Sequence, residues 1–283
     1  MDSKVCVDFH VHSNMSDGTL SPTEVVKLAK EVGLTAIALT DHDTIDGVSE
    51  AIEAGKKYGV KVVPGIEISA EYKGGDLHIL GLNVDYLNEE FIAKVSVCRD
   101  SRHNRNLKMV EKMQQCGFPV TWEEMLKRFG DNSITRAHFA KYLIDEGYVK
   151  DKDEAFNKYL NPGCPCYLPR VKVSPFEAID MIKEAGGHPV LAHPLLYKMP
   201  YDRLESVIVM LQNHGLEGIE GRYALNKVED DVLLDKLAKR HGLKMTGGSD
   251  FHGTIKPDIS IGVGKGDLKV GAVQRKTSLP ILL

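Results

Sequence analysis

Hydrophobic and polar residues alternate along segment 5–12 with the two-residue period of a β-strand. The apolar side chains would share one face of this strand, so His10 and His12 would point together from the other face. A helix is predicted soon afterwards, because Ser21-Pro22-Thr23-Glu24 has the spacing of a capping box with proline at the first helical position. Gly33 marks the end of that helix.

Strands and helices continue to alternate on both sides of a purely helical stretch. Before it, strands are predicted at 35–42, 60–69 and, after a Gly74-Gly75 turn, 76–84, with a helix over about 47–58. From about 88 to 160 only helices are predicted. After it, strands are predicted at 188–194, 216–221 and 243–252, with helices from Ser174 to Gly186, over about 201–213 and over about 228–241. Seven strands that mostly alternate with helices predict a parallel sheet, and in a barrel of this kind the active site lies at the carboxyl ends of the strands.

The composition changes this picture little. The chain has 283 residues, 42% of them hydrophobic, and a formal net charge of −4, which indicates a soluble protein with a large core. That charge argues against binding along a duplex nucleic acid, although a small anion or a short strand gripped at one end would still fit. No apolar run reaches the roughly 18 residues of a membrane span, and the first ten residues lack a signal-peptide core, so a cytoplasmic protein is expected. Five cysteines without paired spacing indicate neither a disulfide framework nor a zinc knuckle.

Residues that commonly bind metal ions gather where the predicted strands end. At these ends lie His10, His12, His42, Glu67, His193, Asp250 and His252. Asp17 lies in the loop after the first predicted strand, and His78 lies near the beginning of the fourth. A single histidine in a strand is more often a hydrogen-bonded core or surface group. Nine such groups at matching topological positions would be costly to bury together unless metal ions compensate their charges. We therefore expect a metal centre at this rim.

These residues lie in several short motifs. The motifs are His10-Val11-His12, Asp17-Gly18, Thr40-Asp41-His42-Asp43, Pro64-Gly65-Ile66-Glu67, His78, Leu191-Ala192-His193-Pro194 and Gly248-Ser249-Asp250-Phe251-His252. In this order they resemble the four motifs of the PHP (polymerase and histidinol phosphatase) family, over about 1–95 and 166–260. The resemblance implies an α/β fold, a distorted (β/α)7 barrel of the PHP type with an inserted helical subdomain. We expect a first barrel part at 1–96, a helical insertion acting as a substrate lid at 97–165, and a second barrel part at 166–283.

The resemblance also implies a site with three divalent ions. His10, His12, Glu67 and Asp250 would hold the first ion, Glu67 would bridge to a second held with His78 and His193, and Asp17, His42 and His252 would hold the third. Glu67, His193 and Asp250 would be the catalytic residues. Imidazole and carboxylate donors without thiolate suit manganese, iron or zinc. Of these, manganese is the ion we expect, with zinc or iron as alternatives. The family often has histidine where Asp17 stands, so the third ion is expected to bind least tightly.

The helical insertion is similar to that of small stand-alone members of the family, which include nucleoside 3′,5′-bisphosphate phosphatases and a 5′→3′ exoribonuclease acting on short RNA. The expected activity is metal-dependent release of phosphate from nucleotides, with the 3′-phosphate of a 3′,5′-bisphosphonucleotide as the target and 5′→3′ hydrolysis of short oligoribonucleotides as a further reaction. Two alternatives stay open: a histidinol phosphatase or other small phosphomonoesterase, and a noncatalytic PHP module that supports a partner. The general acid and the oligomeric state are also open.

The insertion provides two candidate substrate contacts, Arg136 and His138. Arg136 would lie in the first turn of a helix capped by Ser133, where a guanidinium and a helix amino terminus both favour phosphate. His138 would either face the site or pack within the insertion. The segment Arg102-His103-Asn104-Arg105 is expected to be a solvated helix face rather than a basic lip. Trp122 and the nearby tyrosines show no ordered stacking platform for single-stranded nucleic acid.

Overall fold

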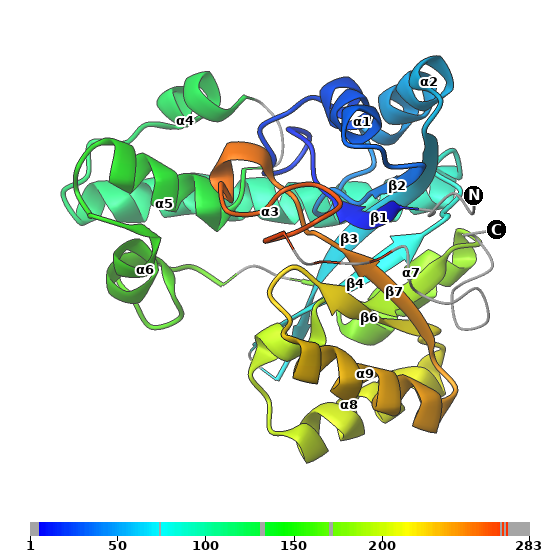
Figure 1. Cartoon of the computed structure of the whole chain (residues 1–283). Helices are drawn as coiled ribbons and strands as arrows, with labels where there is room; N and C mark the ends of the chain where they lie inside the picture. Colours follow the sequence, from blue (N-terminus) through cyan, green and yellow to red (C-terminus); the bar gives the residue numbers. More distant parts are fainter. Residues whose placement is uncertain are drawn as a thin grey trace.

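The computed structural model describes residues 6–73, 75–130, 134–169, 172–266, 268 and 270. Within them, seven strands form one sheet whose spatial order follows the chain from β1 to β7 (Figure 1). The strands are β1 (Val7–Val11), β2 (Ala36–Leu39), β3 (Lys61–Tyr72), β4 (Gly75–Leu82), β5 (His188–Leu191), β6 (Gly218–Tyr223) and β7 (Lys244–Gly248). Each strand predicted from the hydrophobic pattern is present.

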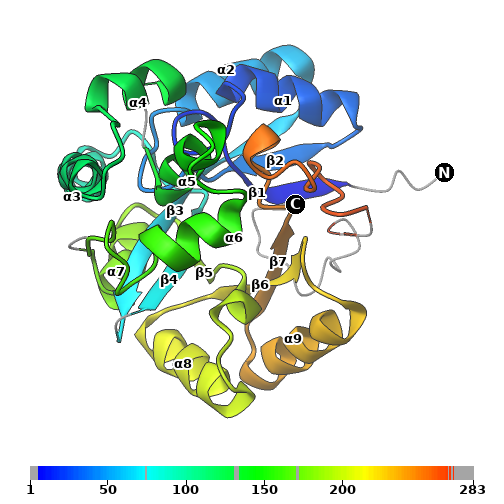
Figure 2. The same ribbon diagram turned by 90° about the vertical axis from the view of Figure 1, so that its left-hand side faces the viewer.

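Helices surround the sheet and cover one of its ends (Figures 1 and 2). Around the sheet lie α1 (Pro22–Glu31), α2 (Val48–Tyr58), α7 (Pro175–Glu184), α8 (Tyr201–His214) and α9 (Val228–His241), with two 3₁₀ turns, η2 (Pro194–Tyr197) and η3 (Gly253–Ile255). The insertion contains α3 (Glu89–Gln115), α4 (Trp122–Phe129), α5 (Arg136–Asp145), α6 (Lys152–Ala155) and the π-helical turn η1 (Phe156–Leu160). The predicted capping boxes at Ser21 and Ser174 are both formed.

Strand β4 runs antiparallel to both of its neighbours, whereas the other paired strands are parallel. The expectation of a fully parallel sheet was therefore wrong at β4. The cause is the short connection, because only residues 73 and 74 separate β3 from β4 and a parallel neighbour needs a crossover of about a dozen residues or more. As a consequence, the first half of β4 lies beside the end of β3, and His78 pairs with Ser69.

The barrel closes where the chain that follows β7 meets the end of β1. The backbone N–H of Asp250 donates to the carbonyl of His10 at 2.8 Å, and the N–H of His12 donates to the carbonyl of Phe251 at 2.9 Å. Gly248 permits this approach, because a Cβ atom there would lie 2.3 Å from the Cβ of His10. The expected distorted α/β barrel is thereby confirmed, and its first and last strands bring their polar ends together.

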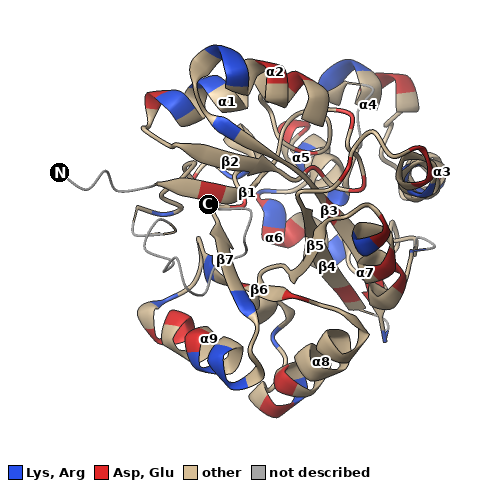
Figure 3. Cartoon of the chain, turned by 90° about the vertical axis from the view of Figure 1, so that its right-hand side faces the viewer, with Lys and Arg blue, Asp and Glu red and all other residues tan. Residues whose placement is uncertain are grey.

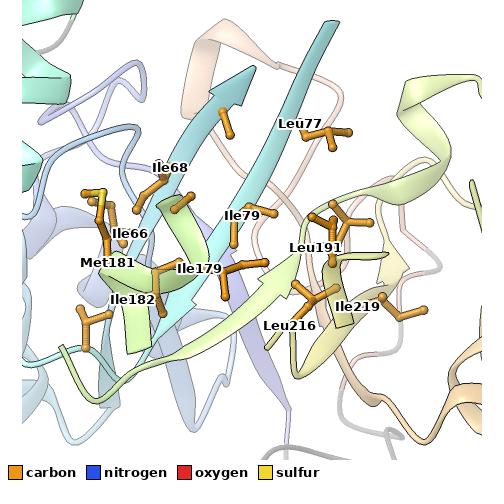
Figure 4. Close-up of a cluster of buried hydrophobic side chains, with 14 of the residues drawn as sticks. Ile66, Ile68, Leu77, Ile79, Ile179, Met181, Ile182, Leu191, Leu216 and Ile219 are labelled. Atoms are coloured by element: carbon orange, nitrogen blue, oxygen red, sulfur yellow. The ribbon is translucent and has the colours of Figure 1, made fainter. Parts of the chain in front are cut away.

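The main hydrophobic core lies between the sheet and the helices that surround it. Figure 4 shows Ile66 and Ile79, from β3 and β4, close to Ile179 and Ile182 of α7. All four side chains are fully buried. This layer of aliphatic side chains fixes β3 and β4, and with them Glu67 and His78.

The insertion has a hydrophobic core of its own, formed by buried residues between Met109 and Cys166. Helix α3 joins the two cores, since Phe91 near its start belongs to the barrel cluster and Met109 belongs to the insertion cluster. The division of the chain at 97 and 165 stays a prediction, and α3 crosses the first of these boundaries.

The surface charge is mixed in sign. Figure 3 shows acidic and basic residues interspersed on α8 and α9, without a continuous basic band in this view. None of the helices in the described part of the chain is long and apolar enough to cross a membrane.

Candidate metal centre

The structure brings all nine predicted ligands together at one rim of the barrel. His10 lies on β1, Glu67 on β3 and His78 on β4, while the others lie in the segments that follow β1, β2, β5 and β7. Only His42 and His78 are partly exposed, and the rest are buried. The antiparallel direction of β4 explains why His78, near the beginning of its strand, reaches the same rim as residues at the ends of theirs.

One group of four donor atoms has the spacing of ligands around a single ion. The Nε2 atoms of His10 and His12 lie 3.1 Å apart, and each lies 3.2 Å from Oε2 of Glu67. Oδ1 of Asp250 lies 3.5 Å from the first imidazole nitrogen and 3.2 Å from the second. Bonds of about 2.1 Å give ligand-to-ligand distances of roughly 3.0 Å in an octahedron and 3.4 Å in a tetrahedron. The donor set therefore fits a first-row divalent ion.

Glu67 faces two groups, one with each carboxylate oxygen. Its Oε2 atom faces the first group, and its Oε1 atom lies 2.7 Å from Nδ1 of His78 and 3.0 Å from Nε2 of His193. His42 also approaches this carboxylate, with its Nδ1 atom 3.1 Å from Oε2. His42, Glu67 and His78 together can hold an ion, which places His42 between the second and third expected groups.

The third expected group, Asp17, His42 and His252, lies together with His12, and the donor atoms of all four lie within 4.8 Å of one another. Oδ1 of Asp17 lies 3.1 Å from Nε2 of His252 and, among the described residues, makes no hydrogen bond despite its burial. The other Asp17 oxygen accepts a hydrogen bond from Oγ1 of Thr135 at 3.0 Å. A buried carboxylate oxygen left without a partner beside imidazoles fits a bound cation.

The charges of the cluster also favour cations. Burial lowers the pKa of His12, but hydrogen bonds from its ring to Asp250 and Glu67 outweigh burial and raise that pKa to about 9. Burial raises the pKa of Glu67, whereas the neighbouring imidazoles of His42 and His10 hold it well below its usual value. The carboxylates are therefore ionised, and divalent ions would take the place of protons on the imidazoles.

A buried carboxylate behind the ligands orients two of them. Glu220 is fully buried, with Oε1 3.0 Å from Nδ1 of His10, and its Oε2 atom accepts the backbone N–H of His193 at 2.8 Å. A proton on Nδ1 of His10 leaves Nε2 free to bind an ion. Glu220 was not among the residues expected at the site, and it lies in the middle of β6.

Asp250 is oriented in the same manner. Its Oδ2 atom accepts hydrogen bonds from the Tyr223 hydroxyl at 2.8 Å and from Nζ of Lys256 at 2.6 Å, which leaves Oδ1 for the cluster. Its backbone φ of 55° and that of His193, 30°, lie in the left-handed region. Such strain costs free energy and is concentrated at functional sites, where the surrounding structure holds it in place.

A cavity of about 280 Å³, which we call the rim cavity, opens over the cluster. Asp17, His42, His78 and His252 form part of its wall. Its cationic residues are Arg102, Arg105, Arg136, Lys152, Lys172 and Lys256.

The expectation of a solvated helix face at 102–105 was wrong for Arg102 and Arg105, which are only 7% and 8% exposed. Arg102 pairs with Asp43 and also donates to Oγ of Ser69 at 3.1 Å.

The two predicted substrate contacts take different positions. Arg136 is the first residue of α5 and lies in the wall of the rim cavity, with a guanidinium nitrogen 3.3 Å from Oδ2 of Asp76. The cap of this helix is Thr135, while Ser133 lies outside the described residues. His138 is buried behind the cap, where its Nδ1 atom accepts the backbone N–H of Thr135 at 3.0 Å. Substrate contact by His138 stays a prediction.

Comparison with known proteins places this geometry in a family. The PHP domain model matches residues 8–160. A 5′-3′ exoribonuclease of Haemophilus influenzae is 36% identical over 245 residues, which are 87% of this chain and 89% of that protein. A 3′,5′-nucleoside bisphosphate phosphatase of Chromobacterium violaceum is 36% identical over 248 residues, 87% of each protein. The crystal structure of a candidate metal-dependent phosphoesterase from Bifidobacterium adolescentis matches with a TM-score of 0.84 and 31% identity, over 98% of this chain and 97% of that one.

Proposed function

The chain belongs to the PHP family of phosphoesterases, and on that premise we propose that it removes the 3′-phosphate of nucleoside 3′,5′-bisphosphates and shortens oligoribonucleotides from the 5′ end. The relatives that bear these two activities cover most of the chain. One observation carries the proposal: a cavity with ligands for metal ions in its wall also contains six cationic side chains. A substrate with two phosphates could place one at the ions and the other against these cations.

Three divalent ions are proposed for the centre. Its imidazole and carboxylate donors suit manganese, iron or zinc, and manganese is our first candidate. His10, His12, Glu67 and Asp250 would hold one ion, Glu67, His78 and His193 the second, and Asp17, His42 and His252 the third. When bound, ions in such a cluster supply a hydroxide nucleophile at neutral pH and neutralise charge on the phosphoryl oxygens. Glu67, His193 and Asp250 are assigned as the catalytic residues. Glu67 would bridge the first two ions, and Asp250 and His193 would each help to hold one of them.

Other side chains would position the substrate and its surroundings. Arg136 is proposed to bind the phosphate that does not react, since it lies in the cavity wall at the amino terminus of α5. Lys256 would hold Asp250 in position through their 2.6 Å hydrogen bond. A cytoplasmic location is proposed on the nature of the substrate and on the five cysteines, which form no disulfide.

A phosphate-release screen tests the proposal. Protein reconstituted with Mn²⁺ would be assayed with adenosine 3′,5′-bisphosphate, a 5′-phosphorylated oligoribonucleotide of five residues, histidinol phosphate and p-nitrophenyl phosphate. We expect rapid release from the bisphosphate and stepwise shortening of the oligoribonucleotide. Release from histidinol phosphate alone would favour a histidinol phosphatase. Less than one equivalent of bound metal, without hydrolysis of any substrate, would favour a noncatalytic module.

A further inference from the structure

A second cavity lies beside the rim cavity, between α3 and the start of α4, and has a volume of about 290 Å³. We call it the Trp122 cavity. Arg102 belongs to the walls of both cavities, so its side chain lies between the two spaces. The volume is at the small end of ligand sites, where a single planar ring fits better than a whole nucleotide.

Two aromatic rings form one part of its wall. Trp122, the first residue of α4, is half-buried, and its ring lies edge-on to that of His103, with centroids 5.2 Å apart at 87°. His103 projects from α3 on the same face as Arg99, Arg102 and Asn106, which follow the i, i+3, i+4, i+7 spacing of one helix face. The sequence showed no series of stacking residues, but the fold provides this single platform.

Two residues of the same wall each have a buried polar atom without a hydrogen-bond partner in the described part of the chain. Asn106 is 1% exposed, and its side-chain nitrogen donates to the carbonyl of Ile134 at 2.6 Å, whereas its Oδ1 atom accepts nothing. Nε of Arg102 is likewise unpartnered, although another nitrogen of the same guanidinium binds Asp43. Buried polar groups rarely remain unsatisfied, so a ligand that offers one donor and one acceptor would complete this wall.

The acidic residues of the cavity argue against a second phosphate there. Asp46 forms an ion pair with Arg99, with Oδ2 and a guanidinium nitrogen 2.8 Å apart, and Asp100 lies in the same wall. Arg102 is already paired with Asp43. Two arginines and two aspartates line this space and balance in charge, whereas six cationic residues and two aspartates line the rim cavity. A neutral planar group with polar edges suits it better than an anion.

We propose that the Trp122 cavity is a nucleobase subsite. The base of the substrate stacks on Trp122, and its polar edge satisfies Oδ1 of Asn106 and Nε of Arg102. This inference rests on the proposed function, because it assumes that the phosphate of a nucleotide occupies the adjoining rim cavity. It explains how the enzyme would discriminate nucleotides from sugar phosphates of similar charge.

A comparison of substrates with and without a base distinguishes the contribution of stacking from that of phosphate binding. Adenosine 3′,5′-bisphosphate would be compared with the bisphosphate of the abasic tetrahydrofuran analogue, which has the same two phosphates. Replacement of Trp122 by Leu, which keeps an apolar side chain for packing, should lower kcat/KM for the nucleotide about 5- to 150-fold, mainly through KM. The abasic substrate should change by less than about twofold, and Trp122→Phe should retain most of the nucleotide preference.

Tyr148→Leu is a matched control, because Tyr148 is an aromatic residue of the insertion that lines neither cavity. It should leave both substrates unchanged. Equal losses on both substrates in Trp122→Leu would overturn the subsite and show that Trp122 only supports the fold. Unchanged kinetics in a folded Trp122→Leu protein would overturn it as well.

Tryptophan fluorescence provides a test that needs no turnover, since Trp122 is the only tryptophan in the chain. Zn²⁺-loaded protein would be titrated with adenosine 5′-monophosphate or ribose 5-phosphate, each at concentrations that inhibit hydrolysis by about 80%. We expect quenching by the nucleotide only. Equal quenching by both ligands, or none by bound nucleotide, would reject the subsite while the proposed function stands. A protein that neither hydrolyses nor binds nucleotides would fail the proposed function itself.

Discussion

Replacement of Glu220 by glutamine tests a buried carboxylate that belongs to none of the three proposed ligand groups. Glu220 orients His10 through Nδ1 at 3.0 Å and receives the backbone N–H of His193 at 2.8 Å, so it positions ligands of two proposed ions. Glutamine has nearly the same size but offers one acceptor oxygen instead of two. Its amide nitrogen must then face one of the two donors, and the negative charge is lost.

The magnitude follows from these two contacts. A hydrogen bond to a charged acceptor contributes about 1.5–3 kcal/mol, and the variant loses one such bond while weakening the other. Removal of a carboxylate that orients a metal-binding imidazole lowers metal affinity about 10- to 100-fold. We expect the affinity for the proposed ions at His10 and His193 to decrease by this factor. The affinity for the proposed ion at Asp17 should decrease less. Excess metal should restore a large part of the activity.

Dialysis against graded Mn²⁺ concentrations, followed by elemental analysis, measures this effect without reference to turnover. Glu217→Gln is the matched control, because Glu217 makes a similar contact with Nδ1 of His188 at 2.7 Å, outside the proposed ligand set. That variant should bind metal like the unmodified protein. Coincident binding curves for Glu220→Gln and the unmodified protein would refute the reasoning, and equal losses in both variants would indicate a general loss of stability.

Three further substitutions test the assigned roles. Glu67→Gln should leave a folded protein that releases almost no phosphate at saturating Mn²⁺, because the bridge between two ions is weakened; near-normal turnover would contradict this role. Asp17→Ala should lower the content of one ion and spare the others, and elemental analysis that finds all or none lost would disprove the grouping. Arg136→Ala should reduce kcat/KM for adenosine 3′,5′-bisphosphate about 10- to 150-fold but hardly affect p-nitrophenyl phosphate, which lacks a second phosphate. Equal losses on both substrates would instead place Arg136 at the reacting phosphate.

Much of the candidate site could be predicted because strand periodicity fixes where side chains point. His10 and His12 point to the same face of the predicted strand 5–12, and His42 and His193 lie at the ends of the predicted strands 35–42 and 188–194, so all four were expected at one rim. The position of His78 could be predicted only together with the direction of its strand. It lies near the start of its strand, and the two-residue connection before it could have indicated the antiparallel pairing that brings it to the rim.

The buried arginines of α3 could not be found in this way. Polar and charged residues surround them in the sequence and repeat with the period of a helix, which is a pattern typical of a solvated helix face. Arg102 is buried by tertiary structure, and its partner Asp43 lies 59 residues away along the chain. Trp122 and His103 illustrate the same limit, since their contact joins two helices whose packing no local pattern describes.

The insertion and the proposed metal centre are joined at Asp17, which would distinguish the proposed third ion from the other two. One oxygen of Asp17 accepts a hydrogen bond from Thr135, the cap of α5, while the other lies 3.1 Å from Nε2 of His252 in the third ligand group. A shift of the insertion must therefore either move this ligand or break its bond to Thr135. With the proposed third ion bound, its occupancy and the position of the insertion would be linked equilibria, each changing the other by the same factor. A substrate phosphate bound by Arg136 would stabilise α5 in position, keep Asp17 beside His252 and strengthen the binding of the proposed ion that is expected to be held least tightly.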